Sequence, residues 1–257
     1  MDETTPSLTI VNRFPQDKPY LLGEELAKLG IRVIKHDFAD IDRIPQPTTA
    51  TLWRLSENLH PQYRHHLTKW EDAGHTLLNS SQTLETCANK LTTYNILHKA
   101  NLPTVPTAPA NPGTPIPANQ IAKPAFGAGG RDITYGPSII PTNTLEPWIV
   151  QPIIGNHAEH LRILVINNKI VAAYKRIPAP NSPVNNIDAG GYREFITPTP
   201  EQQTLALAAT REVNAFIAGI DLTDDPTQVL EINGTPGIPP EYLPSIAQHI
   251  ATHLHNK

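Results

Sequence analysis

Apolar residues recur with helical spacing in several segments of the first hundred residues. Between residues 20 and 29, four leucines fall on one face of a helix that Gly30 ends. Short apolar runs at 8–12 and 31–34 flank this helix and predict strands. The order strand, helix, strand is that of a small βαβ unit. Further along, the pattern predicts strands at 51–55 and 76–78, and helices at 62–73 and within 81–100.

After residue 117 the pattern changes to short β-rich runs. We predict strands at 120–123, 133–135, 148–153, 161–166, 170–175, 192–196 and 229–232, and helices at 200–218 and 241–254. The run ILVINNKIVAAY predicts a hairpin that turns at Asn167 and Asn168. The second half is therefore expected to be a largely antiparallel sheet with flanking helices, an α+β arrangement.

Proline is the unusual feature of the composition. The chain has 27 prolines in 257 residues, and they cluster between the predicted elements. The densest cluster, residues 103–117, predicts a linker between the two halves.

Charge and length exclude several classes of protein. The net charge of −4 argues against a general nucleic-acid binder, and no apolar run is long enough to cross a membrane. The acidic start lacks the features of a signal peptide, and Cys87 is the single cysteine, so a cytoplasmic protein without disulfides is expected.

A glycine-rich loop follows the predicted strand that carries Lys123. Gly127, Gly129 and Gly130 expose backbone N–H groups that can approach a polyanion, and Lys123 would add a positive charge. The alternative is an ordinary flexible hairpin loop.

Three oxygen-bearing side chains lie in the segment GIDLTDDPTQVLEINGTPG. Glu231 and Asn233 are two apart on one strand and share a face, while Asp221 ends the strand before it. Their oxygens suit a Mg²⁺ ion that phosphates also hold, and two acids on one face are costly without a cation. The alternative is a solvated sheet edge.

Arginines provide the remaining candidate chemistry. Arg162 and Arg176 lie on consecutive strands of the predicted hairpin, and together they suggest a second anion-binding surface. Arg54, after a strand of the first half, either holds a substrate carboxylate or is a surface charge.

These motifs occur in a recognisable order. Along the chain lie NKLTTYNIL, AKPAFGAGGRDI, VQPII, LRILVINNKIVAAYKR, NNIDAGG and EINGTPG. In this order the sequence resembles the ATP-grasp superfamily and, within it, the RimK-like ligases that join glutamate or another amino acid to a carboxylate. The resemblance implies an ATP-grasp fold, α/β plus α+β. Its expected parts are an N-terminal α/β domain at 1–87 and an ATP-grasp domain at 88–257, divided into subdomains 88–150 and 151–257.

The resemblance also implies roles for individual residues. Nucleotide would be bound by two lysines, a loop over the phosphates, a hinge that reads adenine and a ribose position: Lys90, Lys123, Gly127, Gly129, Gly130, Arg131, Gln151, Pro152, Ile154 and His160. Mg²⁺ would be bound by Asp221, Glu231 and Asn233. Arg162, Arg176 and Asn186 would lie near the transferred phosphoryl group and the acyl phosphate.

The implied activity is an ATP-dependent ligase that forms an amide through an acyl phosphate, with Mg²⁺ or Mn²⁺. Its substrates would be a small-molecule carboxylate and an amino acid, without nucleic-acid or membrane partners. His160 replaces the usual acidic residue of the family, and Val184 replaces a basic one. These departures leave open a nucleotide-binding regulatory protein without ligase activity. A ligase that modifies a peptide or ribosomal protein is a further alternative.

Overall fold

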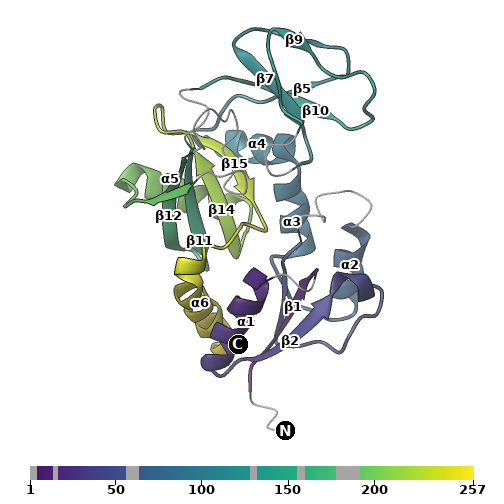
Figure 1. Ribbon diagram of the computed structural model, residues 1–257, viewed down its shortest axis with the longest axis vertical. Helices are drawn as coiled ribbons and strands as arrows, with labels where there is room; N and C mark the ends of the chain where they lie inside the picture. The colour runs from purple at the N-terminus through teal and green to yellow at the C-terminus, as the bar shows by residue number, and fades with distance from the viewer. Residues whose placement is uncertain (1–4, 14–16, 56–63, 128–131, 155–159, 178–191) are drawn as a thin grey trace.

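The computed structural model describes residues 5–13, 17–55, 64–127, 132–154, 160–177 and 192–257. Three sheets follow one another along the longest axis of the molecule (Figure 1). The N-terminal sheet lies at one end, a five-stranded antiparallel sheet lies in the middle, and a smaller sheet lies at the other end. This is the mixture of α/β and α+β architecture that the sequence predicts.

The N-terminal sheet is parallel and has the order β2-β1-β3-β4. Its strands are β1 (Ser7–Asn12), β2 (Arg32–Asp37), β3 (Ala50–Trp53) and β4 (Leu77–Leu78). Helix α1 (Asp17–Lys28) connects β1 to β2, and α2 (Arg64–Asp72) lies between β3 and β4. The predicted βαβ unit is therefore confirmed.

The smaller sheet has the order β5-β10-β7-β8 and follows helices α3 (Ser81–Ala88) and α4 (Lys90–Lys99). Its strands are β5 (Ala108–Ala110), β7 (Gln120–Pro124), β8 (Thr134–Tyr135) and β10 (Trp148–Pro152), and a separate ribbon pairs β6 (Pro115–Ile116) with β9 (Ser138–Ile139). The prediction of a plain linker at 103–117 was therefore wrong. Prolines fit there because β5 is an edge strand, where a missing N–H is tolerated.

The middle sheet is antiparallel throughout, in the order β13-β12-β11-β14-β15. Its strands are β11 (His160–Ile166), β12 (Lys169–Ile177), β13 (Tyr192–Phe195), β14 (Ile217–Leu222) and β15 (Val229–Asn233). Asn167 and Asn168 join β11 to β12 with φ values of 48° and 57°. Two consecutive residues in this left-handed region suit a tight hairpin, as predicted.

The predicted helix 200–218 is shorter in the structure. Helix α5 spans Pro200–Glu212 and begins with a capping box between Thr199 and Gln202. Asn214 then adopts a φ of 51°, which ends helical geometry, and β14 begins at Ile217. Ile217 is apolar because it begins β14, which is buried along its whole length. That Phe216 and Ile217 also continue the helical spacing of apolar residues is a coincidence.

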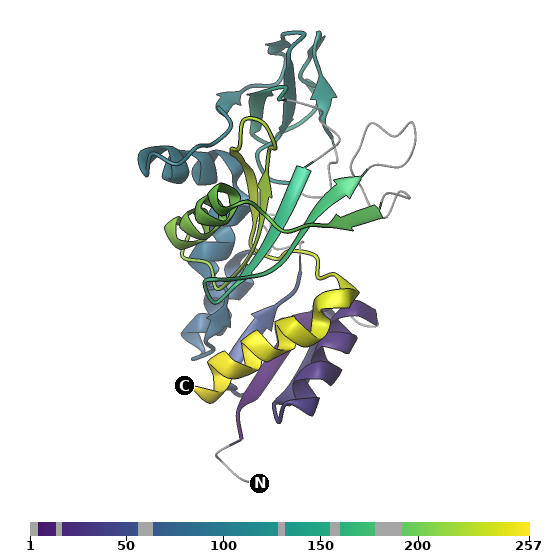
Figure 2. The same ribbon diagram turned by 90° about the vertical axis from the view of Figure 1, so that its left-hand side faces the viewer.

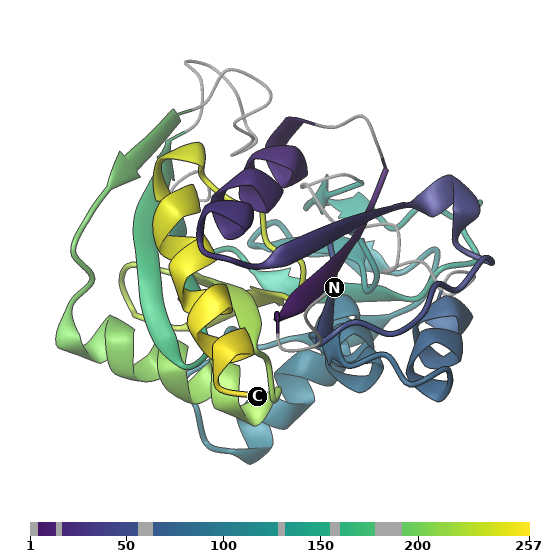
Figure 3. The ribbon, with the colours of Figure 1, turned by 90° about the horizontal axis from the view of Figure 1, so that it is seen from below.

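The last helix returns to the N-terminal sheet. Helix α6 (Leu243–His255) packs beside α1, as Figures 2 and 3 show. One apolar core joins Leu8 of β1 and Leu26 of α1 to Ile246 and Ile250 of α6 and to residues of β11 and β14. Short 3-10 turns at Phe38–Asp40 and Pro240–Tyr242 complete the described elements. None of the described helices is long and apolar enough to cross a membrane.

Candidate functional site

Lys90 joins helix α4 to the start of the glycine-rich loop. Asn89 caps α4 by accepting hydrogen bonds from the N–H groups of Leu91 and Thr92. The Nζ of Lys90 donates to the carbonyl oxygen of Gly127 at 2.7 Å and lies 3.8 Å from Oε1 of Glu231. The first residue of α4 is therefore held between the small sheet and the middle sheet.

Lys123 faces the same place from strand β7. Its side chain is buried, and this burial lowers the pKa of the ammonium group. The nearby charge of Lys90 lowers that pKa further, whereas Glu231 and Asp221 oppose the shift. The structure thus brings together two lysines that are far apart in the sequence, and it sets them opposite two acids.

Asp221 is the centre of a buried ionic cluster on the middle sheet. Arg162 lies opposite Asp221 in the register of β11 and β14, and Glu231 lies opposite it in the register of β14 and β15. Both carboxylate oxygens of Asp221 accept from Arg162, through Nε and through Nη2 at 2.7 Å, and Oδ2 also accepts from Nη2 of Arg176 at 2.6 Å. One acid therefore orients both arginines.

The ion pairing outweighs burial in setting the charge of this cluster. Burial alone would raise the pKa of Asp221, but the positive charges of Arg162 and Arg176 hold that pKa well below its usual range. Burial would likewise lower the pKa of Arg162, and the Asp221 carboxylate raises it instead. Asp221 and Arg162 are therefore both ionised at neutral pH.

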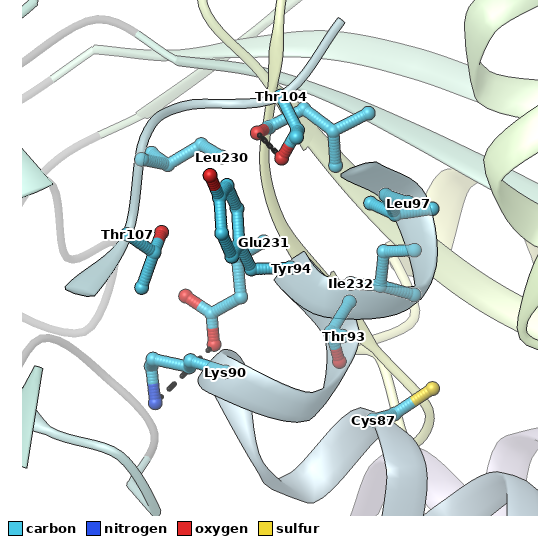
Figure 4. A pocket seen from close by; sticks show the side chains of 11 residues that line it. Cys87, Lys90, Thr93, Tyr94, Leu97, Thr104, Thr107, Leu230, Glu231 and Ile232 are labelled. Carbon is cyan, nitrogen blue, oxygen red and sulfur yellow. Dashed lines mark hydrogen bonds and ion pairs between the residues drawn. The ribbon is translucent and has the colours of Figure 1, made fainter. Parts of the chain in front are cut away.

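A pocket adjoins Lys90 and Glu231 (Figure 4). The carboxylate of Glu231 points toward Lys90, and the ring of Tyr94 lies beside it. Thr107 also lines this pocket and accepts a 2.8 Å hydrogen bond from Nε2 of the buried Gln151. The sequence analysis missed Thr107 because it lies among prolines that were interpreted as a linker, and nothing in the local sequence marks it.

Comparison with known proteins agrees with this geometry. Residues 137–253 match the profile of the RimK-like ATP-grasp domain. D-cycloserine synthetase DcsG shares the fold, with a TM-score of 0.75, 17% identity and coverage of 96% of this chain and 99% of that one. The chain therefore has the ATP-grasp fold, and residues 137–253 are similar to the RimK-like ATP-grasp domain.

The curated relatives to which the chain is similar include glutamate ligases of two archaea. The tetrahydromethanopterin:alpha-L-glutamate ligase of Methanocaldococcus jannaschii is 30% identical over 183 residues, which is 62% of each chain. The coenzyme gamma-F420-2:alpha-L-glutamate ligase of Methanococcus maripaludis is 26% identical over 214 residues, 74% of this chain and 69% of that protein. The chain thus spans less than two thirds of the length of the first of these relatives.

The residues predicted to form the hinge lie at the end of strand β10. Pro152 pairs with Gln120 of β7, and the N–H of Ile153 donates to the carbonyl of Asn119 at 2.8 Å. Ile154 follows, half-buried. The Oε1 atom of Gln151 is buried and has no hydrogen-bond partner among the described residues. That the hinge reads adenine stays a prediction.

Other predicted site residues fall partly outside the described chain. His160 begins β11 opposite Arg176, where a positive charge on its ring would lower the pKa of Asp221. That His160 contacts the ribose stays a prediction. Gly127 lies within the described residues, and its carbonyl oxygen accepts the hydrogen bond from Nζ of Lys90. Gly129, Gly130, Arg131 and Asn186 lie outside the described residues, as does Val184.

The predicted Mg²⁺ ligands lie on two neighbouring strands, and that they bind a metal stays a prediction. Glu231 and Asn233 are two residues apart on β15, and Asp221 is the cross-strand neighbour of Glu231. Within the described ranges, no group of three or more His, Cys, Asp and Glu could hold a metal ion by itself. Two acids with an amide oxygen and phosphate oxygens would supply the hard donors that Mg²⁺ prefers.

Proposed function

We propose that this ATP-grasp protein is an ATP-dependent ligase that joins a carboxylate to an amine through an acyl phosphate. The observation that carries the proposal is the meeting of Lys90 and Lys123 with the cross-strand row of Arg162, Asp221 and Glu231. Two lysines suit the phosphates of ATP, and the acids beside them suit its Mg²⁺ ion, or Mn²⁺ in its place.

Glutamate is the amino acid that the relatives favour. Both curated relatives described above carry alpha-L-glutamate ligase in their names, which also name tetrahydromethanopterin and coenzyme gamma-F420-2. We therefore take the amine to be that of L-glutamate and the acceptor to be a carboxylate on a small metabolite. The division into domains at 1–87 and 88–257 belongs to the same proposal.

The chemistry proceeds in two displacements. A carboxylate oxygen of the first substrate attacks the γ-phosphorus of ATP, and ADP leaves. The amine then attacks the acyl carbon, phosphate leaves with the electrons of the broken C–O bond, and the amine proton passes to solvent. When bound, Mg²⁺ supplies neutralisation of the phosphate charge, and Asp221, Glu231 and Asn233 would hold it.

The protein residues position the reactants and stabilise the negative charge that develops. Lys90 and Lys123 would bind phosphate oxygens as point charges. Nη2 of Arg176 donates a hydrogen bond to Asp221. The buried Nε of Arg176 has no hydrogen-bond partner in the described part of the chain. This remaining donor suits an oxygen of the acyl phosphate, so that catalysis would rest on orientation and charge.

Release of ADP from ATP tests the proposal directly. The protein is incubated with ATP, Mg²⁺ and a panel of small carboxylates, with and without L-glutamate. We expect ADP release that requires both a carboxylate and the amine, and an amide product of matching mass. Binding of ATP without ADP release across the panel would contradict the ligase and favour the nucleotide-binding regulatory protein.

Replacement of Lys123 by Met is expected to weaken ATP binding about 10-fold or more, because a buried charge–phosphate contact is lost. Lys69→Met is the matched control, since the Lys69 side chain is 55% exposed and pairs only loosely with Asp42. Titration calorimetry with a non-hydrolysable ATP analogue gives both affinities. Equal affinities in the two variants would remove Lys123 from the nucleotide site.

A further inference from the structure

The N-terminal sheet has a topological switch point beside the ionic cluster. From β1 the chain passes to β2 on one side and then to β3 on the other, so the order reverses between β1 and β3. In open parallel sheets, ligands bind at the carboxyl ends of the strands at such a point. Here Asn12 ends β1, and Arg54 directly follows β3.

Asn12 and Arg54 are neighbours on one face of the sheet. Val11 pairs with Trp53, and the N–H of Arg54 donates to the carbonyl of Val11 at 2.9 Å. Continued by one residue, this register sets Asn12 opposite Arg54. Because side chains alternate along a strand, both belong to the face that carries Ile10 and Leu52.

The polar groups at this point are incompletely satisfied. Arg54 donates from Nη2 to the carbonyl oxygen of Pro236 at 2.6 Å, but its Nε and Nη1 atoms are buried without a hydrogen-bond partner in the described chain. The Nδ2 atom of Asn12, a residue only 2% exposed, also has none there. Burial lowers the pKa of Arg54 to about 10, and no acid among the described residues counters this shift, so the guanidinium is still charged at pH 7.

This arrangement is costly unless an anion completes it. A buried charge without a counter-charge destabilises a fold, and buried N–H groups normally have acceptors. A carboxylate would supply one negative charge and two acceptor oxygens. A phosphate dianion would bring two negative charges. Arg54 would balance one of them, and the neutral amide of Asn12 could not balance the other.

The unsatisfied donors lie next to the candidate reaction centre. A Cβ atom added to Gly219 would lie 2.7 Å from Cβ of Pro236 and 2.8 Å from Nη1 of Arg162. Pro236, whose carbonyl binds Arg54, therefore packs in the same place as the guanidinium of Arg162. Pro236 also follows β15, which carries Glu231 and Asn233.

We infer that Arg54, with Asn12, binds a carboxylate that a substrate carries in addition to its reacting group. The inference rests on the proposed function for the identity of the ligand as a substrate. These two residues of the N-terminal sheet would then select dicarboxylate substrates over the corresponding monoamides. Pro236 then links this selection to the Arg162–Asp221 cluster.

Binding of L-glutamate and glutarate, with L-glutamine for comparison, tests the inference without turnover. Titrations use the full chain saturated with a non-hydrolysable ATP analogue and Mg²⁺. We expect the parent to bind at least one dicarboxylate more tightly than L-glutamine, and Arg54→Met to lose about 10-fold or more of that affinity. Arg43→Met, at an exposed arginine of the same part of the chain, should not change it.

Thermal unfolding separates binding from support of the fold. Arg54→Met removes a buried charge for which the described residues supply no counter-charge, and it keeps the bulk of the side chain, so its melting temperature should equal or exceed that of the parent. A lower melting temperature with unchanged dicarboxylate affinity would overturn the inference and leave Arg54 a structural link to Pro236. Absence of saturable dicarboxylate binding by the parent would overturn it as well.

The proposed ligase activity fails by a different measurement. If ADP release never depends on a carboxylate and an amine, the ligase is contradicted, while an Arg54-dependent dicarboxylate affinity would still establish the anion site. If ADP release occurs normally and Arg54→Met leaves the KM for every dicarboxylate unchanged, the ligase stands and the site is refuted.

Discussion

Asp221→Asn is expected to lower the free energy of unfolding by about 3–5 kcal/mol, the usual cost of removing one partner from a buried ionic cluster. The substitution keeps the shape of the side chain but leaves Arg162 and Arg176 without their shared counter-charge. Arg162 is the more affected, because it is almost fully buried. Urea unfolding followed by circular dichroism measures the change.

Asp224→Asn is the matched control for this prediction. Asp224 also forms a salt bridge, with Lys175 at 3.0 Å, but its side chain is 57% exposed. Exposed pairs contribute at most about 1 kcal/mol. A loss of stability in Asp221→Asn no larger than that in Asp224→Asn would show that the cluster does not hold the sheet together.

The same cluster predicts acid sensitivity. Because the pKa of Asp221 is lower in the folded chain than in the unfolded chain, its contribution is complete above about pH 4. The contribution is lost as the pH falls from there toward the lowered pKa. The difference in unfolding free energy between the parent and Asp221→Asn should therefore shrink on acidification below pH 4.

Glu231→Gln is expected to reduce acceptor-dependent ADP release by about 100-fold or more, the scale on which preorganised charge at a reacting phosphate acts. The variant is nearly isosteric, and it removes the negative charge that faces Lys90 and raises the pKa of Lys123. Among the described residues the half-buried carboxylate has no close hydrogen-bond partner, so the melting temperature should change little. Initial rates over a Mg²⁺ series measure turnover and metal dependence together.

Glu212→Gln, at an exposed position at the end of α5, provides the comparison for charge loss alone. It should retain the turnover of the parent. Parental turnover in Glu231→Gln at every Mg²⁺ concentration would contradict the roles assigned to Glu231.

Local rules account for the elements that the sequence predicts well. The Asn167-Asn168 turn and the glycine that ends α1 depend on backbone preferences of a few residues, which any sequence displays. The predicted end of α5 was wrong because Ile217 suits both a helical face and a buried strand, and only its pairing with β11 decides between them. The strand β5 was missed because its partner, β10, lies about forty residues away.

In the candidate site, too, local sequence predicts some features and long-range contacts determine the others. The sequence places Asp221, Glu231 and Asn233 by simple alternation, and the structure keeps them on neighbouring strands. Asp221 and Glu231 do not depend on a bound cation alone, because the chain supplies its own positive charges in Arg162, Arg176 and Lys90. Those contacts join residues up to 141 positions apart, and no local pattern reports them.

The packing of α6 against α1 and β1 has a consequence for biosynthesis. The N-terminal sheet leaves the ribosome long before α6 is made, and until then the apolar face that contains Leu8, Leu26 and Leu52 has no cover from Ile246 and Ile250. Nascent chains expose such faces to chaperones and to one another. A premature stop before residue 243 would therefore release a polypeptide that aggregates, even though all of the residues assigned to nucleotide binding would already be present.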